Sequence, residues 1–207
     1  MVWGRYERDD GMKQVIEWFM GPNGILCILV IIFAFIHWGL KIRYLSIRNI
    51  VMNHINCFRN PNGKLLVVPV FIYMIMPLFI AIYIAKNKIV TEGILNILTI
   101  IISILTAMLF TLLTVIIDMK NKIKVDNKYS GVEVKNIIQA LKETYYTIMF
   151  EIFISILLLI LCLINVFISE YTFLQSILIY YFSLLMIMNL LMILKRISAV
   201  LDVEIEK

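Results

Sequence analysis

The sequence contains few charged residues and few cysteines, and both shortages narrow the class of protein. Only 16% of the 207 residues are charged, whereas 62% are hydrophobic. A soluble domain of this size could not bury that much apolar surface. The three cysteines are an odd number, and Cys27 and Cys162 lie within apolar runs. We therefore predict small core residues at these positions and no disulfide framework.

Recognisable enzyme motifs are also missing from the sequence. It has no glycine-rich phosphate-binding loop, no paired-histidine metalloprotease motif and no nucleophile with an evident base. His54 and Cys57 have a spacing that suits a metal, but no further ligand is near. We therefore expect no enzyme activity, no cofactor and no metal site. A lipid-modifying enzyme that uses Glu151 or Asp118 is the catalytic alternative, although no second catalytic group stands at a recognisable spacing.

What the sequence does contain is five long apolar runs. Crossing a hydrocarbon core of about 30 Å takes roughly 20 residues in helical form, and each run is long enough or nearly so. We predict an all-α, polytopic membrane protein with five transmembrane helices, and a four-span alternative omits the first and shortest run. The predicted spans are residues 25–40, 65–85, 94–117, 152–169 and 172–194. Pro69 and Pro77 should kink the second span.

The first 24 residues differ from the rest of the chain. They lack the basic start and adjoining apolar stretch of a signal peptide. Trp3 and Trp18 suit the headgroup zone of a membrane, where amphipathic rings settle. We predict an interfacial segment at residues 1–24, followed by a helical membrane domain at residues 25–207.

Basic residues gather in the first and third loops, and this placement predicts the orientation. The only basic residues of the second loop are Lys86 and Lys88. Lys and Arg accumulate on the cytoplasmic side, so five spans put the N-terminus outside and the C-terminus in the cytosol. The four-span alternative puts both ends inside. Forty Ile against six Ala is the bias of an AT-rich gene, so we expect the inner (plasma) membrane of a bacterium.

Two cytosolic stretches are predicted to continue spans as helices. Apolar residues recur at helical spacing through residues 41–58. Ser130 and Glu133 form a capping box, so a second helix should begin near Gly131 and continue through residues 131–151 into the fourth span. Its apolar face should bind a soluble partner protein, and lying flat on the bilayer is the alternative. That face comprises Val134, Ile137, Ile138, Leu141 and Tyr145.

Polar side chains on the third and fourth spans fall on one face of each helix. At about 100° per residue they occupy arcs of roughly 140° and 80°. Such stripes could line an ion path whose acidic groups, near the cytosolic mouth, favour cations. Small residues four apart also let helices pack closely, so helix packing is the alternative. The pore-lining candidates are Asn96, Thr99, Ser103, Thr106, Thr111, Thr114 and Asp118 on the third span and Glu151, Ser155 and Asn165 on the fourth.

These features lead to two functional hypotheses. One copy could hardly enclose a conduit with five helices, so a pore requires a homo-oligomer. We expect a homo-oligomeric ion channel, in contact with membrane lipids and controlled by a soluble cytosolic protein or a small ligand. We expect no direct binding of nucleic acid. The alternative is a non-catalytic membrane anchor or sensor subunit that recruits a soluble partner through the two cytosolic helices.

The organisation of the chain resembles that of the small multi-span membrane subunits of bacterial antiphage systems of the Kiwa and Hailong type. The resemblance covers the whole chain and consists of length, number of spans, short basic cytosolic loops and biased composition. It includes no diagnostic motif, so no functional residue is carried over. It implies an antiviral defence effector or sensor controlled by a partner encoded beside it, with membrane depolarisation as its output.

Overall fold

The computed structural model describes residues 47–60, 63–125, 131–166 and 171–205, together with Gly24 and Cys27. Within these residues every named element is a helix. One isolated bridge joins Arg59 to Leu65, and Gly63 takes the left-handed φ of 75° in the turn between them. The prediction of an all-helical protein is confirmed for the described part of the chain.

Four helical stretches of the described chain are long and apolar enough to cross a membrane. They correspond to the second, third, fourth and fifth predicted spans. Apart from Gly24 and Cys27, the first predicted span and the interfacial segment lie outside the described residues, so the choice between five and four spans stays a prediction. The four stretches are Val67–Asn87, Glu92–Ile123, Ile137–Ile164 and Phe173–Ser198.

The second predicted span is interrupted near its two prolines. It consists of α4 (Val67–Val70), the π-helical turn η2 (Phe71–Ile75) and α5 (Met76–Asn87). Pro77 stands at the start of α5, and just before it the N–H of Met76 donates to the carbonyl of Phe71. Proline cannot donate the next backbone hydrogen bond, and a wider turn beside it is a common way for a helix to adapt. The helix is therefore irregular where the prolines stand, and the predicted kink itself stays a prediction.

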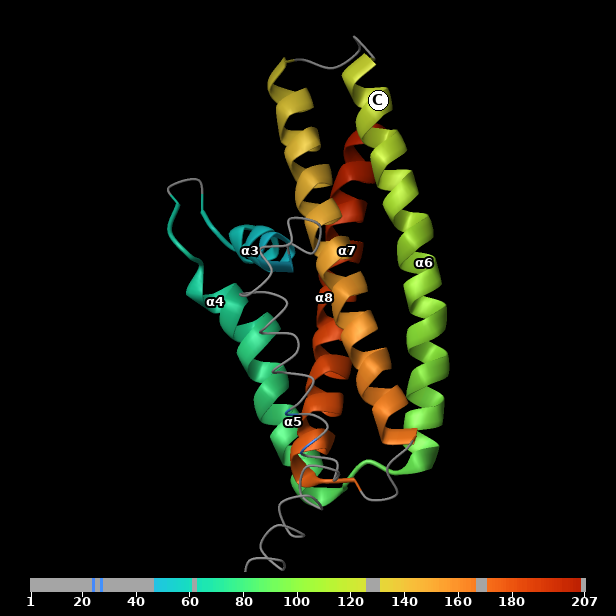
Figure 1. Ribbon diagram of the computed structural model, residues 1–207. Coiled ribbons are helices and arrows are strands. Elements are labelled where there is room, and N and C mark those ends of the chain that lie inside the picture. The colour runs from blue at the N-terminus through green and yellow to red at the C-terminus, as the bar shows by residue number, and fades with distance from the viewer. Residues whose placement is uncertain are drawn as a thin grey trace, which may run out of the picture.

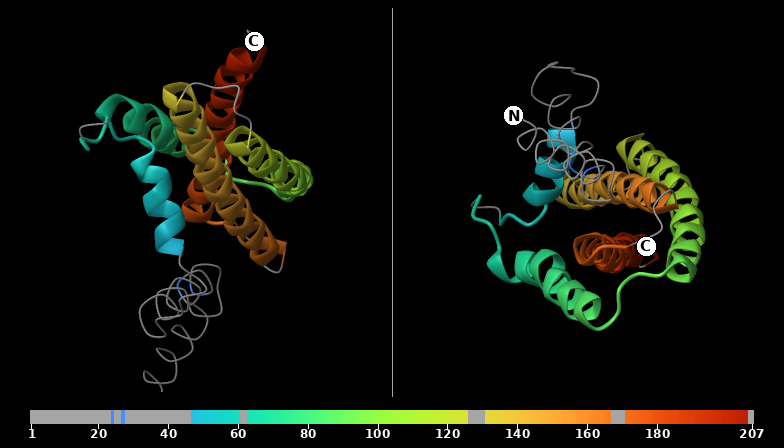
Figure 2. Two further views of the ribbon diagram at one scale, coloured as in Figure 1. Left: turned by 90° about the horizontal axis from the view of Figure 1, so that it is seen from above. Right: turned by 60° about the horizontal axis from the view of Figure 1, so that its bottom comes forward.

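Three long helices form an antiparallel core. They are α6 (Glu92–Val125), α7 (Gly131–Val166) and α8 (Phe173–Ile205). Helix α7 lies in the middle and packs against α6 on one side and α8 on the other, while α5 packs against the far side of α8 (Figures 1 and 2). As predicted, α7 continues without a break from Gly131 into the fourth span.

The contact between α6 and its neighbours repeats every seven residues. The buried residues of α6 are Leu95, Ile102, Leu109, Ile116 and Ile123. Apolar side chains at this period keep one seam of a helix against its partner and favour the small crossing angle of left-handed helix pairs. Two clusters of buried side chains follow, one towards each end of the bundle.

Helix α3 (Ile47–Asn56) lies across the bundle rather than along it (Figures 1 and 2). It packs against α7, where Ile50 and Val51 contact a third cluster built around Phe150 and Ile154. The amphipathic helix predicted at residues 41–58 thus forms from Ile47 onward. Its predicted connection to the first span lies outside the described residues.

The same end of the bundle holds the C-terminal end of α6, the N-terminal end of α7 and the C-terminal end of α8 (Figure 1). Lys120 and Lys122 lie in the C-terminal part of α6, towards this end, whereas Lys86 lies in the last turn of α5, at the other end. The structure therefore separates the basic and the basic-poor connections along the axis of the bundle.

Candidate functional site

A series of polar side chains lies inside the bundle, where it is covered by apolar neighbours. Four of them lie on α7 at spacings of three and four residues, which place side chains on one face of a helix. Three lie on α8, and one lies on α3. Each is at most 1% exposed. The series consists of His54, Thr144, Thr147, Glu151, Ser155, Gln175, Ser176 and Asn189.

The centre of this series is a contact between an acid and an amide. Asn189 Nδ2 on α8 donates to Glu151 Oε2 on α7 at 3.0 Å, and both residues are 0% exposed. One turn away, Ser155 Oγ donates to the carbonyl of Glu151 at 2.9 Å and approaches Met186 Sδ at 3.9 Å. Glu151 Oε1 and Asn189 Oδ1 have no hydrogen-bond partner. A buried polar atom without a hydrogen-bond partner is costly, so two acceptors of this contact remain unsatisfied.

A cation joins the same two helices nearer the basic end. Arg196 on α8 pairs with Glu143 on α7 at 3.4 Å and donates to Thr147 Oγ1 at 3.1 Å. The two charged side chains are 17% and 34% exposed, so this pair is only partly shielded from solvent. The Arg196 guanidinium therefore binds Glu143 and Thr147 and not the Glu151 carboxyl group.

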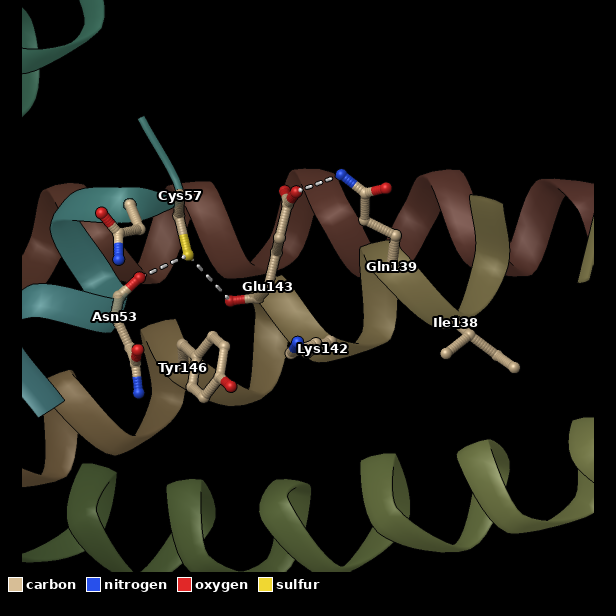
Figure 3. A pocket seen from close by; sticks show the side chains of 8 residues that line it. Asn53, Cys57, Ile138, Gln139, Lys142, Glu143 and Tyr146 are labelled. Carbon is tan, nitrogen blue, oxygen red and sulfur yellow. Dashed lines mark hydrogen bonds between the residues drawn. The ribbon is translucent and has the colours of Figure 1, made fainter. Parts of the chain in front are cut away.

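A pocket of about 430 Å³ opens between α3 and α7 at this level (Figure 3). Two amide groups of α3 face a glutamine, a lysine, a glutamate and a tyrosine of α7, so the lining offers donors, acceptors and both signs of charge. Its residues are Asn53, Asn56, Cys57, Ile138, Gln139, Lys142, Glu143 and Tyr146.

The α7 side of the pocket is partly organised by contacts within the helix. Gln139 Nε2 donates to Glu143 Oε1 at 3.2 Å, and Lys142 Nζ lies 5.8 Å from the centre of the Tyr146 ring. Cys57 Sγ connects the two walls, since it lies 3.2 Å from the carbonyl of Asn53 and 3.8 Å from that of Glu143. Burial raises the pKa of the Cys57 thiol, against an opposing effect of the Arg196 charge. The thiol is therefore not an activated nucleophile.

His54 closes the inner end of the α3 contact. Its ring stacks on Phe150 at a centroid distance of 4.0 Å and meets Phe58 edge-on at 5.2 Å. Burial, assisted by the Arg196 charge, lowers the pKa of His54 to about 3. Both ring nitrogens lack a partner, so the neutral ring serves as a packing group. In the described part of the chain, no three His, Cys, Asp or Glu residues gather as a metal would require.

The predicted polar stripe of the third span lies on the outer surface of α6. Asn96, Ser103, Thr111, Thr114 and Asp118 are exposed, and Thr99 and Thr106 are half-buried. Each hydroxyl group donates to a carbonyl of its own helix, at distances from 2.6 Å to 3.2 Å. The half-buried Thr99 also has a side-chain hydrogen bond with Cys162 of α7, so this end of the stripe touches the neighbouring helix.

The structure does not bring the two predicted pore-lining stripes together within one copy. The α6 stripe faces outward, whereas Glu151 and Ser155 face α8 in the interior. The side chain of Asn165, the remaining candidate on the fourth span, lies outside the described residues. Any path lined by both stripes would have to connect two separate surfaces.

The predicted partner-binding face of α7 is largely occupied by α6. Ile137 and Leu141 are 7% and 1% exposed and belong to the cluster that contains Ile116 and Ile123. Ile138 and Tyr145 are half-buried beside that cluster, and the side chain of Val134 lies outside the described residues. Ile138 also lines the pocket between α3 and α7, so this part of the predicted face remains open.

Several residues of the site were not among the sequence-based candidates. Asn189, Gln175 and Arg196 recur at multiples of seven along the fifth span, which is the period of a helix seam. This period could have identified them from the sequence. Ser176 has a structural role, because its Oγ accepts a hydrogen bond from the N–H of Val90 at 3.1 Å.

Comparisons of the chain with protein-family models, with curated proteins and with solved structures gave no match.

Proposed function

We propose that this chain is a homo-oligomeric membrane effector that conducts ions along a path lined by the outer face of α6. The observation that supports the proposal is the outward position of the α6 stripe. In a lone copy, Ser103, Thr111 and Thr114 would face lipid tails along the middle of a span. Polar side chains are costly in contact with lipid. An assembly of several copies in which these residues face a shared central axis would remove them from lipid.

Such a ring would provide a suitable lining for ions. The hydroxyl oxygens of the stripe keep lone pairs available after donating to their own helix, so they can contact water or a cation. Asp118 is exposed near the end of the stripe. The Asp118 side chains of all subunits together would form an acidic ring. Acidic rings at a pore entrance favour cations, so we propose a cation-preferring path.

The proposed orientation follows from charge. The basic connections are attached towards one end of the bundle, and basic residues accumulate on the cytoplasmic side of membranes. We place this end in the cytosol of a bacterial cell, with five spans and the N-terminus outside. The pocket between α3 and α7 then lies on the cytosolic side, where a soluble protein or a small ligand would control the path. The resemblance to antiphage membrane subunits suggests infection as the setting.

The second candidate function is a membrane anchor or sensor without conductance. The observation that favours it is the same pocket, because α3 lies across the bundle and presents Asn53 and Asn56 beside the charged groups of α7. In this alternative the pocket is a recognition site, and the α6 stripe packs helices of neighbouring copies together.

Conductance of the purified full chain in planar bilayers separates the two candidates. The wild type should give discrete currents, Ser103→Leu should reduce them several-fold, and Asp118→Asn should weaken the preference for cations. Met108→Leu is the matched control, because Met108 is 62% exposed on the apolar flank of the same helix, and it should leave the currents unchanged. Intact oligomers that stay silent with the candidate activators and co-purify with a soluble partner would contradict conduction and support the anchor.

A further inference from the structure

The contact between Glu151 and Asn189 has a specific deficiency. One hydrogen bond joins Asn189 Nδ2 to Glu151 Oε2 at 3.0 Å, and the other oxygen of each group has no partner. Both of these unpaired atoms are acceptors if the carboxyl group is ionised. Two bare acceptors that belong to groups already in contact, both 0% exposed, are an unfavourable arrangement inside an apolar bundle.

No cation offsets a negative charge at this position. Among the described residues, Asn189 supplies the one hydrogen bond to the Glu151 carboxyl group. The Arg196 guanidinium is bound to Glu143 at 3.4 Å and to Thr147 at 3.1 Å. An ionised carboxylate with one amide donor would be expensive in the membrane interior. Among the described side chains, the other charged or titratable groups on the helices packed against α7 are Glu92, Asp118, Lys120 and Lys122 on α6, Arg48 and His54 on α3, and Tyr180, Tyr181 and Lys195 on α8.

We propose that Glu151 and Asn189 form a proton-binding site in the interior of the bundle. The carboxyl group is held as the neutral acid, with its proton on Oε1. This O–H donates to Asn189 Oδ1, while the amide N–H continues to donate to Oε2. The two groups then form a closed ring of two hydrogen bonds, and a single proton satisfies both atoms that are otherwise unpaired.

The site couples protonation to the contact between α7 and α8. When the proton leaves to water, the carboxylate and the amide oxygen face each other as two acceptors, and the buried charge has no counter-ion. The α7–α8 contact must then loosen to admit water or a cation. This inference concerns the interior of one copy and does not depend on conduction through the α6 stripe.

Infrared spectroscopy of the full chain in lipid nanodiscs tests the site directly. A protonated carboxylic acid has a C=O stretch that an ionised carboxylate lacks, so the neutral Glu151 of this proposal should give such a band. We expect one such band, which shifts on ¹³C labelling of glutamate and disappears in Glu151→Gln. Glu143→Gln is the matched control, because Glu143 is paired with Arg196 on the same helix, and this variant should keep the band.

A second variant tests the pairing with the amide. Asn189→Leu removes the hydrogen bond that the acid's carbonyl oxygen accepts, so the band should move to higher frequency. Absence of an acid band in the labelled wild type, or its persistence in Glu151→Gln, would overturn the proton site. A band that does not move in Asn189→Leu would overturn the role of Asn189. The isotope shift needs no substitution, so the first result stands even if a variant fails to fold.

Discussion

Two groups of polar side chains in this bundle have similar chemistry and opposite environments. On α6, hydroxyl groups face outward and bond to their own backbone. On α7 and α8, polar groups face inward, and Glu151 bonds to Asn189 across the helix contact. The exposed hydroxyl groups of the first arrangement bond within their own helix, and its half-buried Thr99 reaches Cys162 of α7, whereas the second arrangement joins α7 to α8 through buried groups. The position of a polar residue in the bundle, and not its type, therefore decides its proposed role. Exposed residues of α6 are candidates for lining a path, and buried residues of α7 and α8 form structural or proton-binding contacts.

The largest difference in stability is expected between a buried and an exposed leucine of α7. Leu158 is 0% exposed, whereas Leu163 on the same helix is 60% exposed. Leu158→Ala leaves a cavity and should reduce the free energy of unfolding by about 2 kcal/mol or more, even though lipid replaces water outside. Leu163→Ala should change it by less than about 0.5 kcal/mol. Denaturant unfolding in mixed micelles measures both, and equal losses would contradict the described packing.

A smaller effect is expected for a matched pair of asparagines. Asn189→Leu removes the hydrogen-bond partner of the buried Glu151 carboxyl group and should cost about 1–3 kcal/mol of stability. Asn96 is exposed near the start of α6, and Asn96→Leu should be neutral or slightly stabilising. The same unfolding assay compares them, and a loss confined to the Asn96 variant would reverse the assignment of inside and outside.

A third effect concerns α3 and appears as acid sensitivity. The folded pKa of His54, about 3, lies below its unfolded value near 6.5. The unfolded chain therefore binds the extra proton first, so the contribution of the neutral ring to stability is present above about pH 6.5 and declines as pH falls towards 3. His54→Phe keeps a ring against Phe150 and cannot titrate.

Thermal unfolding midpoints measured between pH 7 and pH 4 test this expectation. The wild type should lose more stability than the His54→Phe variant over that interval. Parallel curves for the two proteins would contradict the burial of a neutral His54 against α7.

Much of the fold was predictable because long apolar runs and helix-forming stretches dominate the sequence. The positions of four spans, the continuous helix from Gly131 and the irregularity near Pro69 and Pro77 follow from local pattern alone. Local pattern does not reveal which neighbour a face will meet. The apolar stripe with Ile137 and Leu141 was therefore interpreted as a partner surface, although α6 covers it in the structure.

The candidate site was only partly predictable for the same reason. Helical periodicity placed Glu151 and Ser155 on one face of the fourth span but could not show that α8 supplies Asn189 as the partner. Helical periodicity also predicted the stripe on α6, but which of its residues are exposed depends on how α6 packs against α7. His54 was set aside as a metal ligand because no further ligand is near in the sequence, but the sequence could not show that its ring packs against Phe58 and Phe150.

The contrast between the two polar regions can be measured with one pair of serines. In a background without Cys27, Cys57 and Cys162, Ser103→Cys and Ser155→Cys would each be treated with a water-soluble, membrane-impermeant thiol reagent in proteoliposomes. Ser103 is exposed on α6 and Ser155 is 0% exposed between α7 and α8. We expect labelling of the Ser103→Cys variant, because this position faces water in the assembled path. We expect protection of the Ser155→Cys variant, because this position is buried between α7 and α8. Protection of the first or labelling of the second would contradict this account.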